Sequence, residues 1–150
     1  MFEDVYEKPM IVGAPLPFDL PGWDAGAPFE EYLGIRIEEA VDGRARLTMP
    51  FKVKLAQGEG LMHGGAVTAL VDTAVAVAIK SLLREESNFV TTELSLVFHA
   101  PVRGGVVRAK AEVERRDERT FIGTAEIFDE KGVKVATFHS TFKLVRRRPL

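Results

Sequence analysis

Residues 64 to about 83 are apolar on almost every side of the helix that they would form, and they are rich in alanine. A surface helix keeps one polar face, so a helix of this kind must be surrounded by other parts of the fold. Its most apolar stretch, residues 66–79, is shorter than the roughly 20 residues that span a membrane, and it contains Asp72 and two threonines. The segment therefore predicts one long helix at the centre of a soluble protein, with no membrane partner.

The rest of the chain predicts an antiparallel sheet around that helix. Charged and apolar residues alternate most regularly over residues 106–116, which is typical of a strand with one buried and one solvated face. The turn at residues 129–132 predicts a hairpin between the last two strands. The expected fold class is α+β, an antiparallel sheet wrapped around one long central helix. The strand candidates are residues 35–40, 44–49, 89–98, 106–116, 120–128 and 133–144.

The chain has 150 residues, which predicts a single domain over residues 29–145. Residues 1–28 contain five prolines and predict an irregular arm lying over this domain, and residues 146–150 form a basic tail. A proline start and a glycine stop predict a short helix over residues 28–34. Because one helix cannot cover the whole sheet and the sheet has exposed edges, we expect at least a homodimer.

Composition excludes several classes of partner and chemistry. The 20 basic and 22 acidic side chains nearly cancel, so no overall field favours nucleic acid. The absence of cysteine removes disulfides and thiolate chemistry and favours a reducing, cytoplasmic location. The first ten residues do not have the pattern of a signal peptide. Only three histidines are present, widely spaced, so we expect no metal site.

The motif His63-Gly64-Gly65 stands where a loop becomes the long helix. Two glycines are costly in a helix, so they indicate a close approach to the backbone. The first N–H groups of a helix have no internal partner and lie at its positive end, so the Gly64 N–H could stabilise an oxyanion. The alternative is that the glycines only permit tight packing of the chain.

Asp72 has apolar helical neighbours, which makes its carboxylate costly to bury. Facing a cavity, it would be a base or a nucleophile with a pKa raised by desolvation. The structural alternative is an aspartate that bonds a nearby backbone N–H or Thr68. His63 and Asp72 are nine residues apart, so they lie on opposite sides of the helix and about 13 Å apart along it. One site that uses both must combine two subunits.

These residues resemble the hot-dog fold thioesterases, specifically the phenylacetic-acid-degradation (PaaI-like) family of acyl-CoA thioesterases. The resemblance covers roughly residues 30–144 and rests first on the aspartate nine residues after the histidine of the His-Gly-Gly motif. It rests further on Leu70, Ala74, Thr91-Thr92-Glu93-Leu94 and Phe98-His99-Ala100-Pro101.

The resemblance implies a role for each matching position. Asp72 would be the nucleophile or general base, and the Gly64 N–H would polarise the thioester carbonyl. His63 would hold the loop and the substrate carbonyl, and the Thr91 hydroxyl would place water or the carboxylate. Further substrate-binding positions are Gln57, Gly58, Gly65, Phe98 and Arg103.

Two positions depart from the family pattern. Gln57 replaces the usual asparagine and adds a methylene group, and Ala100 stands where an arginine often precedes the proline. Arg103 is then a possible substitute for the missing arginine.

The resemblance implies hydrolysis of an aryl- or medium-chain acyl-CoA to the free acid and CoA, with no cofactor beyond the CoA of the substrate. It also implies a homodimer, and a dimer of dimers. Two alternatives stay open. One is a non-catalytic acyl-CoA binding or ligand-sensing protein, suggested by Gln57. The other is a structural dimer in which Asp72 is a satisfied buried acid.

Overall fold

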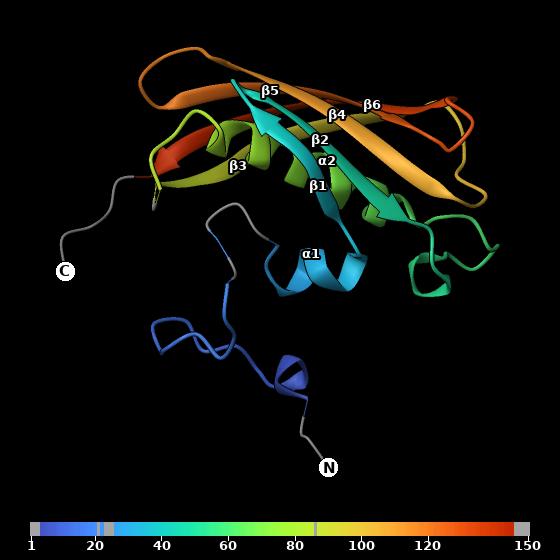
Figure 1. Cartoon of the computed structure of the whole chain (residues 1–150), viewed down its shortest axis with the longest axis horizontal. Coiled ribbons are helices and arrows are strands. Elements are labelled where there is room, and N and C mark those ends of the chain that lie inside the picture. Colours follow the sequence, from blue (N-terminus) through green and yellow to red (C-terminus); the bar gives the residue numbers. More distant parts are fainter. Residues whose placement is uncertain (1–3, 21, 23–25, 86, 146–150) are drawn as a thin grey trace.

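In a computed structural model, which describes residues 4–20, 22, 26–85 and 87–145, a six-stranded antiparallel sheet wraps around one long helix, α2 (Gly64–Lys80) (Figure 1). The strand order is β1-β2-β4-β5-β6-β3, so β1 and β3 are the two edges. This confirms the predicted fold class. The strands are β1 (Arg36–Val41), β2 (Arg44–Pro50), β3 (Asn88–Phe98), β4 (Val106–Arg115), β5 (Thr120–Phe128) and β6 (Lys134–Val145).

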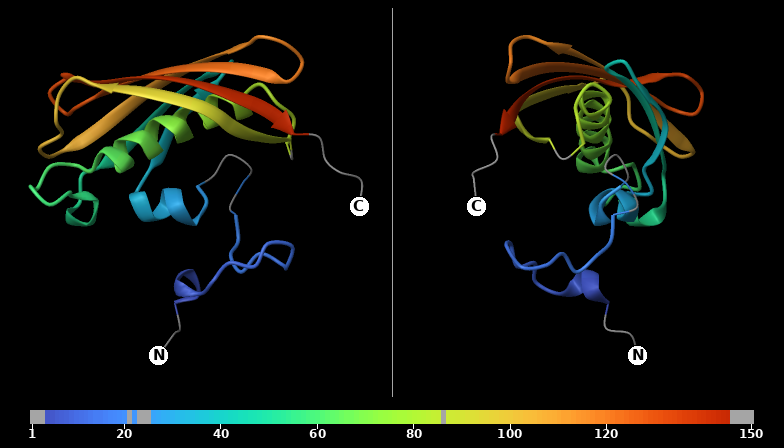
Figure 2. Two further views of the ribbon diagram at one scale, coloured as in Figure 1. Left: turned by 180° about the vertical axis from the view of Figure 1, so that it is seen from behind. Right: turned by 60° about the vertical axis from the view of Figure 1, so that its left-hand side comes forward.

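The core lies between α2 and the concave face of the sheet, where α2 contacts chiefly β4, β2 and β5 (Figure 2). The predicted alternation in β4 is confirmed, because Val107 and Ala109 are buried while Arg108 and Lys110 are exposed. The helix also approaches β5 closely: a side chain on Gly123 would collide with Val75. A glycine is therefore needed at this crossing.

The central helix ends at Lys80, three residues before the predicted end. Ser81 follows it, and its Oγ donates a hydrogen bond to the Ala78 carbonyl (2.6 Å) and accepts one from the Gly43 N–H (2.8 Å). This hydroxyl ties the end of α2 to the β1–β2 turn. It provides a local reason for the early stop, since it competes for the helix's last backbone groups.

The predicted short helix is present as α1 (Pro28–Leu33), which ends at Gly34 with a φ of 76°. The segment at 50–62, predicted as a loop, contains the 3-10 helix η2 (Val53–Leu55) and a bridge between Ala56 and Met62. Helix α1 packs against α2 on the side away from the sheet (Figure 2).

The prediction that the N-terminal arm lies over the domain is wrong for the residues that the structure describes. Over residues 4–20, which include the 3-10 helix η1 (Val5–Glu7), no side chain is buried. The arm extends beyond α1, on the side away from the sheet (Figures 1 and 2). The concave face is occupied by α2. The predicted basic tail at 146–150 lies outside the described residues.

Candidate active site

The start of α2 is fixed by a side-chain cap. His63 has extended backbone angles, and its Nδ1 accepts a hydrogen bond from the Gly65 N–H at 2.8 Å. A Cβ on Gly65 would lie 2.8 Å from the same Nδ1, so glycine is needed for this contact. Since Nδ1 accepts, a neutral His63 carries its proton on Nε2, on an exposed ring. The structure thus gives His63 a loop-holding role and leaves a second ring nitrogen available.

Gly64, the first residue of α2, lies under the ring of Phe98. A Cβ at this position would be 3.1 Å from the Phe98 Cζ, so the glycine permits the close approach. In the part of the chain that the structure describes, no acceptor bonds the Gly64 N–H. The close packing of Phe98 therefore explains why a glycine stands here. The Gly64 N–H itself is a helix N-terminal donor without an acceptor among the described residues.

Hydrogen bonds within the loop before α2 hold Gln57 in place. The Gln57 side-chain oxygen accepts a hydrogen bond from the Glu59 N–H, and its backbone N–H donates to the Leu61 carbonyl at 2.8 Å. Gly58 is exposed at the tip of this loop. The Met62 N–H donates to the Val102 carbonyl at 3.0 Å, which brings the segment with the exposed Arg103 beside the loop.

Asp72 and Thr91 form a second group, farther along the helix. The Thr91 hydroxyl on β3 donates to the Asp72 Oδ1 at 2.9 Å. Burial raises the pKa of Asp72 above its usual value, the bond from Thr91 opposes that shift, and the negative charge of Glu30 adds to it. Asp72 is thus a partly buried carboxyl whose carboxylate is more basic than that of an exposed aspartate.

Glu30 is a neighbour of Asp72 that the sequence did not indicate. It lies on α1, and its Oε2 is buried without a hydrogen-bond partner. An acidic residue in the first turn of a short helix is ordinarily explained by the helix dipole. Only the packing of α1 against α2 reveals the proximity, so the sequence carries no signal for it.

Within one chain, the structure does not bring the residues at the start of α2 together with Asp72 and Thr91. Gly64 and Asp72 are eight residues apart on α2, about 12 Å at 1.5 Å per residue. Strand β3 passes both of them, with Thr91 near its start at Asp72 and Phe98 at its end against Gly64. This separation agrees with the prediction that one chain alone does not bring His63 and Asp72 together.

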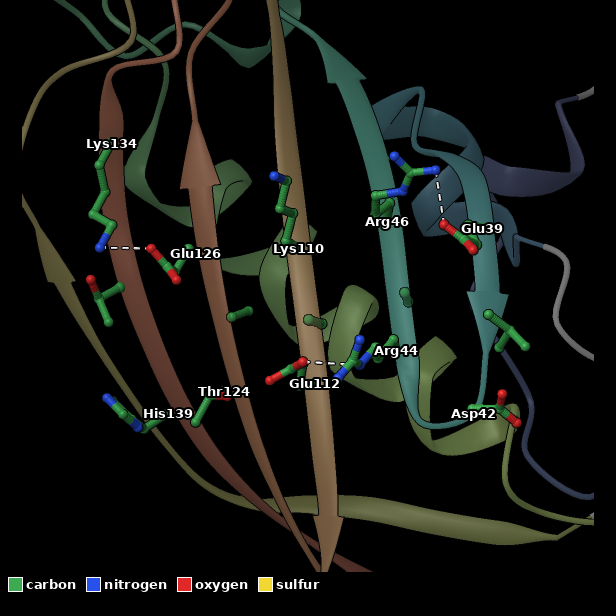
Figure 3. Close-up of a pocket in the computed structure, with 15 residues that line it drawn as sticks. Glu39, Asp42, Arg44, Arg46, Lys110, Glu112, Thr124, Glu126, Lys134 and His139 are labelled. Atoms are coloured by element: carbon green, nitrogen blue, oxygen red, sulfur yellow. Dashed lines mark ion pairs between the residues drawn. The ribbon is translucent and has the colours of Figure 1, made fainter.

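A broad depression on the outer, convex face of the sheet contains none of the predicted site residues (Figure 3). Charged side chains line it and pair across neighbouring strands: Arg44 with Glu112 (3.0 Å), Arg46 with Glu39 (2.8 Å) and Lys134 with Glu126 (2.6 Å). Because these ion pairs are exposed to solvent, they contribute little to stability.

Two kinds of feature are absent from the residues that the structure describes. Within them, no group of three or more His, Asp or Glu side chains is arranged to hold a metal ion. No helix in that same part of the chain is long and apolar enough to cross a membrane.

An antiparallel six-stranded sheet wrapped around one long central helix is the hot-dog fold of thioesterases. The chain belongs to the thioesterase superfamily, whose family model matches residues 59–136. It is accordingly a hydrolase of the thioesterase type.

Several known proteins are similar to this chain. The proofreading thioesterase EntH of Klebsiella pneumoniae is 31% identical over 106 residues, covering 71% of this chain and 77% of the relative. The 1,4-dihydroxy-2-naphthoyl-CoA hydrolase of Escherichia coli is 33% identical over 101 residues, covering 67% and 74%. The solved structure of the Escherichia coli PaaI protein, from the phenylacetic acid degradation operon, superimposes with a TM-score of 0.74 at 26% identity, covering 80% of this chain and 86% of that one.

Proposed function

We propose that this protein hydrolyses an aryl- or medium-chain acyl-CoA thioester to the free acid and CoA. The observation that carries the proposal is Asp72, partly buried on the central helix, bonded by Thr91 and with a raised pKa. The 1,4-dihydroxy-2-naphthoyl-CoA hydrolase of Escherichia coli is named for an aryl-CoA ester, which supports the proposed substrate class. No cofactor is needed in this proposal.

The proposed reaction uses two groups. With Asp72 as general base, its carboxylate takes a proton from water while the water oxygen bonds to the thioester carbonyl carbon. The electron pair moves to the carbonyl oxygen, which the unpaired Gly64 N–H stabilises. The C–S bond then breaks, and the CoA thiolate takes the proton from Asp72. With Asp72 as nucleophile, its oxygen bonds to the thioester carbonyl carbon, and the C–S bond breaks to give an acyl anhydride and the CoA thiolate. Water then cleaves the anhydride to the free acid and the Asp72 carboxylate, and the proton released from water goes to the thiolate.

The Asp72 carboxylate and the Gly64 N–H meet if a second copy of the chain pairs with the first through β3. This strand is an edge with four large apolar side chains about half exposed, Val90, Leu94, Val97 and Phe98. Antiparallel pairing of two β3 strands reverses their directions, so the Thr91 end of one subunit lies beside the Phe98 end of its partner. We propose this dimer, which brings Asp72 of one subunit toward Gly64 of the other. A dimer of dimers remains a prediction.

The second candidate function is acyl-CoA binding without turnover. Gln57 favours it, because its side-chain oxygen accepts a hydrogen bond from the Glu59 N–H, which holds the amide on its own loop. The third reading, a structural acid, gains some support from the bond that Thr91 donates to Asp72. It is disfavoured because burial outweighs that bond in setting the pKa of Asp72.

The test is CoA release, measured with a thiol reagent, from phenylacetyl-, benzoyl-, hexanoyl- and decanoyl-CoA by the wild type and by Asp72→Ala. We expect rapid release from at least one ester by the wild type and its collapse in the variant. Tight binding of these esters with no release by the wild type would select the binding protein. The absence of both binding and release would select the structural reading.

A further inference from the structure

The N-terminal arm, described over residues 4–20, is rich in apolar residues but buries none of its side chains. Six large apolar side chains of the arm are about half exposed or more: Tyr6, Met10, Ile11, Val12, Leu16 and Leu20. The first three of them line one groove together with Pro9, Pro15 and Phe18. An exposed apolar surface of this kind marks an interaction site. The three prolines of the arm restrict its backbone, which lowers the entropy cost of docking.

The domain has an exposed apolar patch of its own, on α1 and η2. Phe29 and Tyr32 are three residues apart on α1, so they share a face of this helix, and both are more than half exposed. The Lys54 Nζ lies 4.1 Å from the centre of the Tyr32 ring, which places η2 beside α1. Val53 on η2 is 91% exposed. We call this surface the α1–η2 patch; it consists of Phe29, Tyr32, Lys52, Val53 and Lys54.

The arm and the α1–η2 patch differ in charge as well. Residues 4–20 contain three acidic residues and one lysine, whereas residues 50–56 contain two lysines and no acidic residue. Both of these lysines, Lys52 and Lys54, are exposed. The charge complementarity lies on the η2 side of the patch, since α1 itself carries Glu30 and Glu31. An acidic apolar arm therefore fits this patch better than an anionic membrane surface, which would repel it.

The exposed area of the chain is larger than that of a compact monomer. The chain exposes 10148 Å², whereas a compact monomer of 16.6 kDa exposes about 7,600 Å². The excess of about 2,500 Å² is roughly three times the area that each partner buries in a standard interface. Pairing through β3 alone therefore does not account for it. The arm leaves its own α1–η2 patch exposed and extends beyond α1 (Figure 1), so a second copy supplies the matching surface.

We propose that the arm of one subunit packs on the α1–η2 patch of a second copy of the chain, and that the exchange is reciprocal. The apolar side chains of the arm lie against Phe29, Tyr32 and Val53, and the two lysines of the patch lie near the acidic residues of the arm. A two-fold pair uses each surface once in each direction, so the contact closes without forming an open chain of subunits. The proposal concerns assembly and does not depend on the proposed hydrolysis.

The test exploits the absence of cysteine from the chain, because engineered cysteines are then the only thiols. Ile11→Cys in the arm and Val53→Cys in the patch are introduced into separate full-length chains, which are co-expressed and treated with a short bismaleimide cross-linker. The matched control pairs Ile11→Cys with Val41→Cys, a half-exposed residue on edge strand β1. A second experiment places Ile11→Cys and Val53→Cys in one chain and co-expresses it with an excess of the wild-type chain.

We expect Ile11→Cys and Val53→Cys to give a cross-linked pair of chains in several-fold higher yield than the control. In the second experiment, the excess of wild-type chain should suppress cross-linking. Joint substitution Lys52→Glu and Lys54→Glu should lower the yield several-fold, because it removes the charge complementarity, while Lys131→Glu on the β5–β6 turn should not.

Two results would overturn the proposal. Cross-linking within one chain that survives the excess of wild type would show that the arm folds onto its own domain. A yield from Ile11→Cys and Val53→Cys no higher than that of the control would show that the arm does not reach the patch of a second copy. Binding of the wild type to phosphatidylcholine vesicles, together with this second result, would assign the arm to a membrane surface. Each of these outcomes can be read without any measurement of hydrolysis.

Discussion

The Thr91 hydroxyl donates a hydrogen bond to Oδ1 of Asp72 at 2.9 Å and so links edge strand β3 to the central helix. The bond fixes one oxygen of a carboxylate whose charged form burial disfavours. It also places the proposed reacting group beside the strand through which a second copy is proposed to pair. One contact thus affects both the position and the basicity of Asp72.

Thr91→Val removes this donor without much change of shape. Because the bond stabilises the charged carboxylate, its loss raises the pKa of Asp72 further, and the acid limb of kcat/KM moves to higher pH. We nevertheless expect kcat to fall roughly tenfold, because the carboxylate is no longer held in place for attack and this loss of orientation outweighs the gain in basicity. Thr91→Ser, which keeps the hydroxyl, restores both values. An acid limb that stays in place in Thr91→Val would contradict this role.

Asp72→Asn separates stability from activity. The pKa of Asp72 is raised above 3.8, so the folded state binds the proton more tightly than the unfolded chain. Wild-type stability therefore decreases, relative to the variant, as the pH rises from 3.8 through the raised pKa. At pH 7 we expect Asp72→Asn to have a Tm at or above that of the wild type. A large fall in Tm, measured by calorimetry, would support the structural reading of Asp72.

The sequence predicted the features that local patterns determine. The apolar run at 64–83 was sufficient to predict a buried helix, and the alternation in β4 was sufficient to predict a strand with one buried face. The two patterns can be told apart because side chains repeat with different periods in helices and strands. The spacing of His63 and Asp72 was sufficient to place them on different sides of α2.

Features that depend on contacts between distant segments were missed, and so was one local side-chain contact in the loop before α2. The packing of α1, which carries Glu30, against α2 was not indicated by the sequence. The described part of the arm extends away from the sheet beyond α1, which proline content cannot reveal. The Gln57 side chain closes its own turn onto Glu59, an arrangement set by the local fold of the loop.

Gly65→Ala tests the cap at the start of α2. Alanine is the better helix former, so propensity alone predicts a gain in stability. A Cβ would nevertheless lie 2.8 Å from the His63 Nδ1 and displace the capping bond. We expect a net loss of about 1 kcal/mol in the free energy of unfolding, measured with urea. Gly58→Ala is the control, since its Cβ would meet open space. Stabilisation by Gly65→Ala would contradict the capping role.

Leu94→Lys tests the proposed dimer. Leu94 lies near the middle of the segment between Thr91 and Phe98, so two-fold pairing of β3 strands places the two lysines close together. We expect dissociation to monomers, seen by light scattering, together with loss of hydrolysis. Val41→Lys, at a similarly exposed apolar residue on the opposite edge strand β1, should change neither. An intact, active dimer in Leu94→Lys would rule out this pairing.

The central claim is that Asp72 carries out thioester hydrolysis. The most direct measurement is the rate of CoA release by Asp72→Asn and by the wild type at pH 7, on the ester that the wild type cleaves fastest, with ester binding to both measured by calorimetry. The account predicts that the variant binds the ester but releases CoA at least about a hundredfold more slowly, the usual contribution of a general base. A variant that binds the ester and releases CoA within about threefold of the wild-type rate would contradict it.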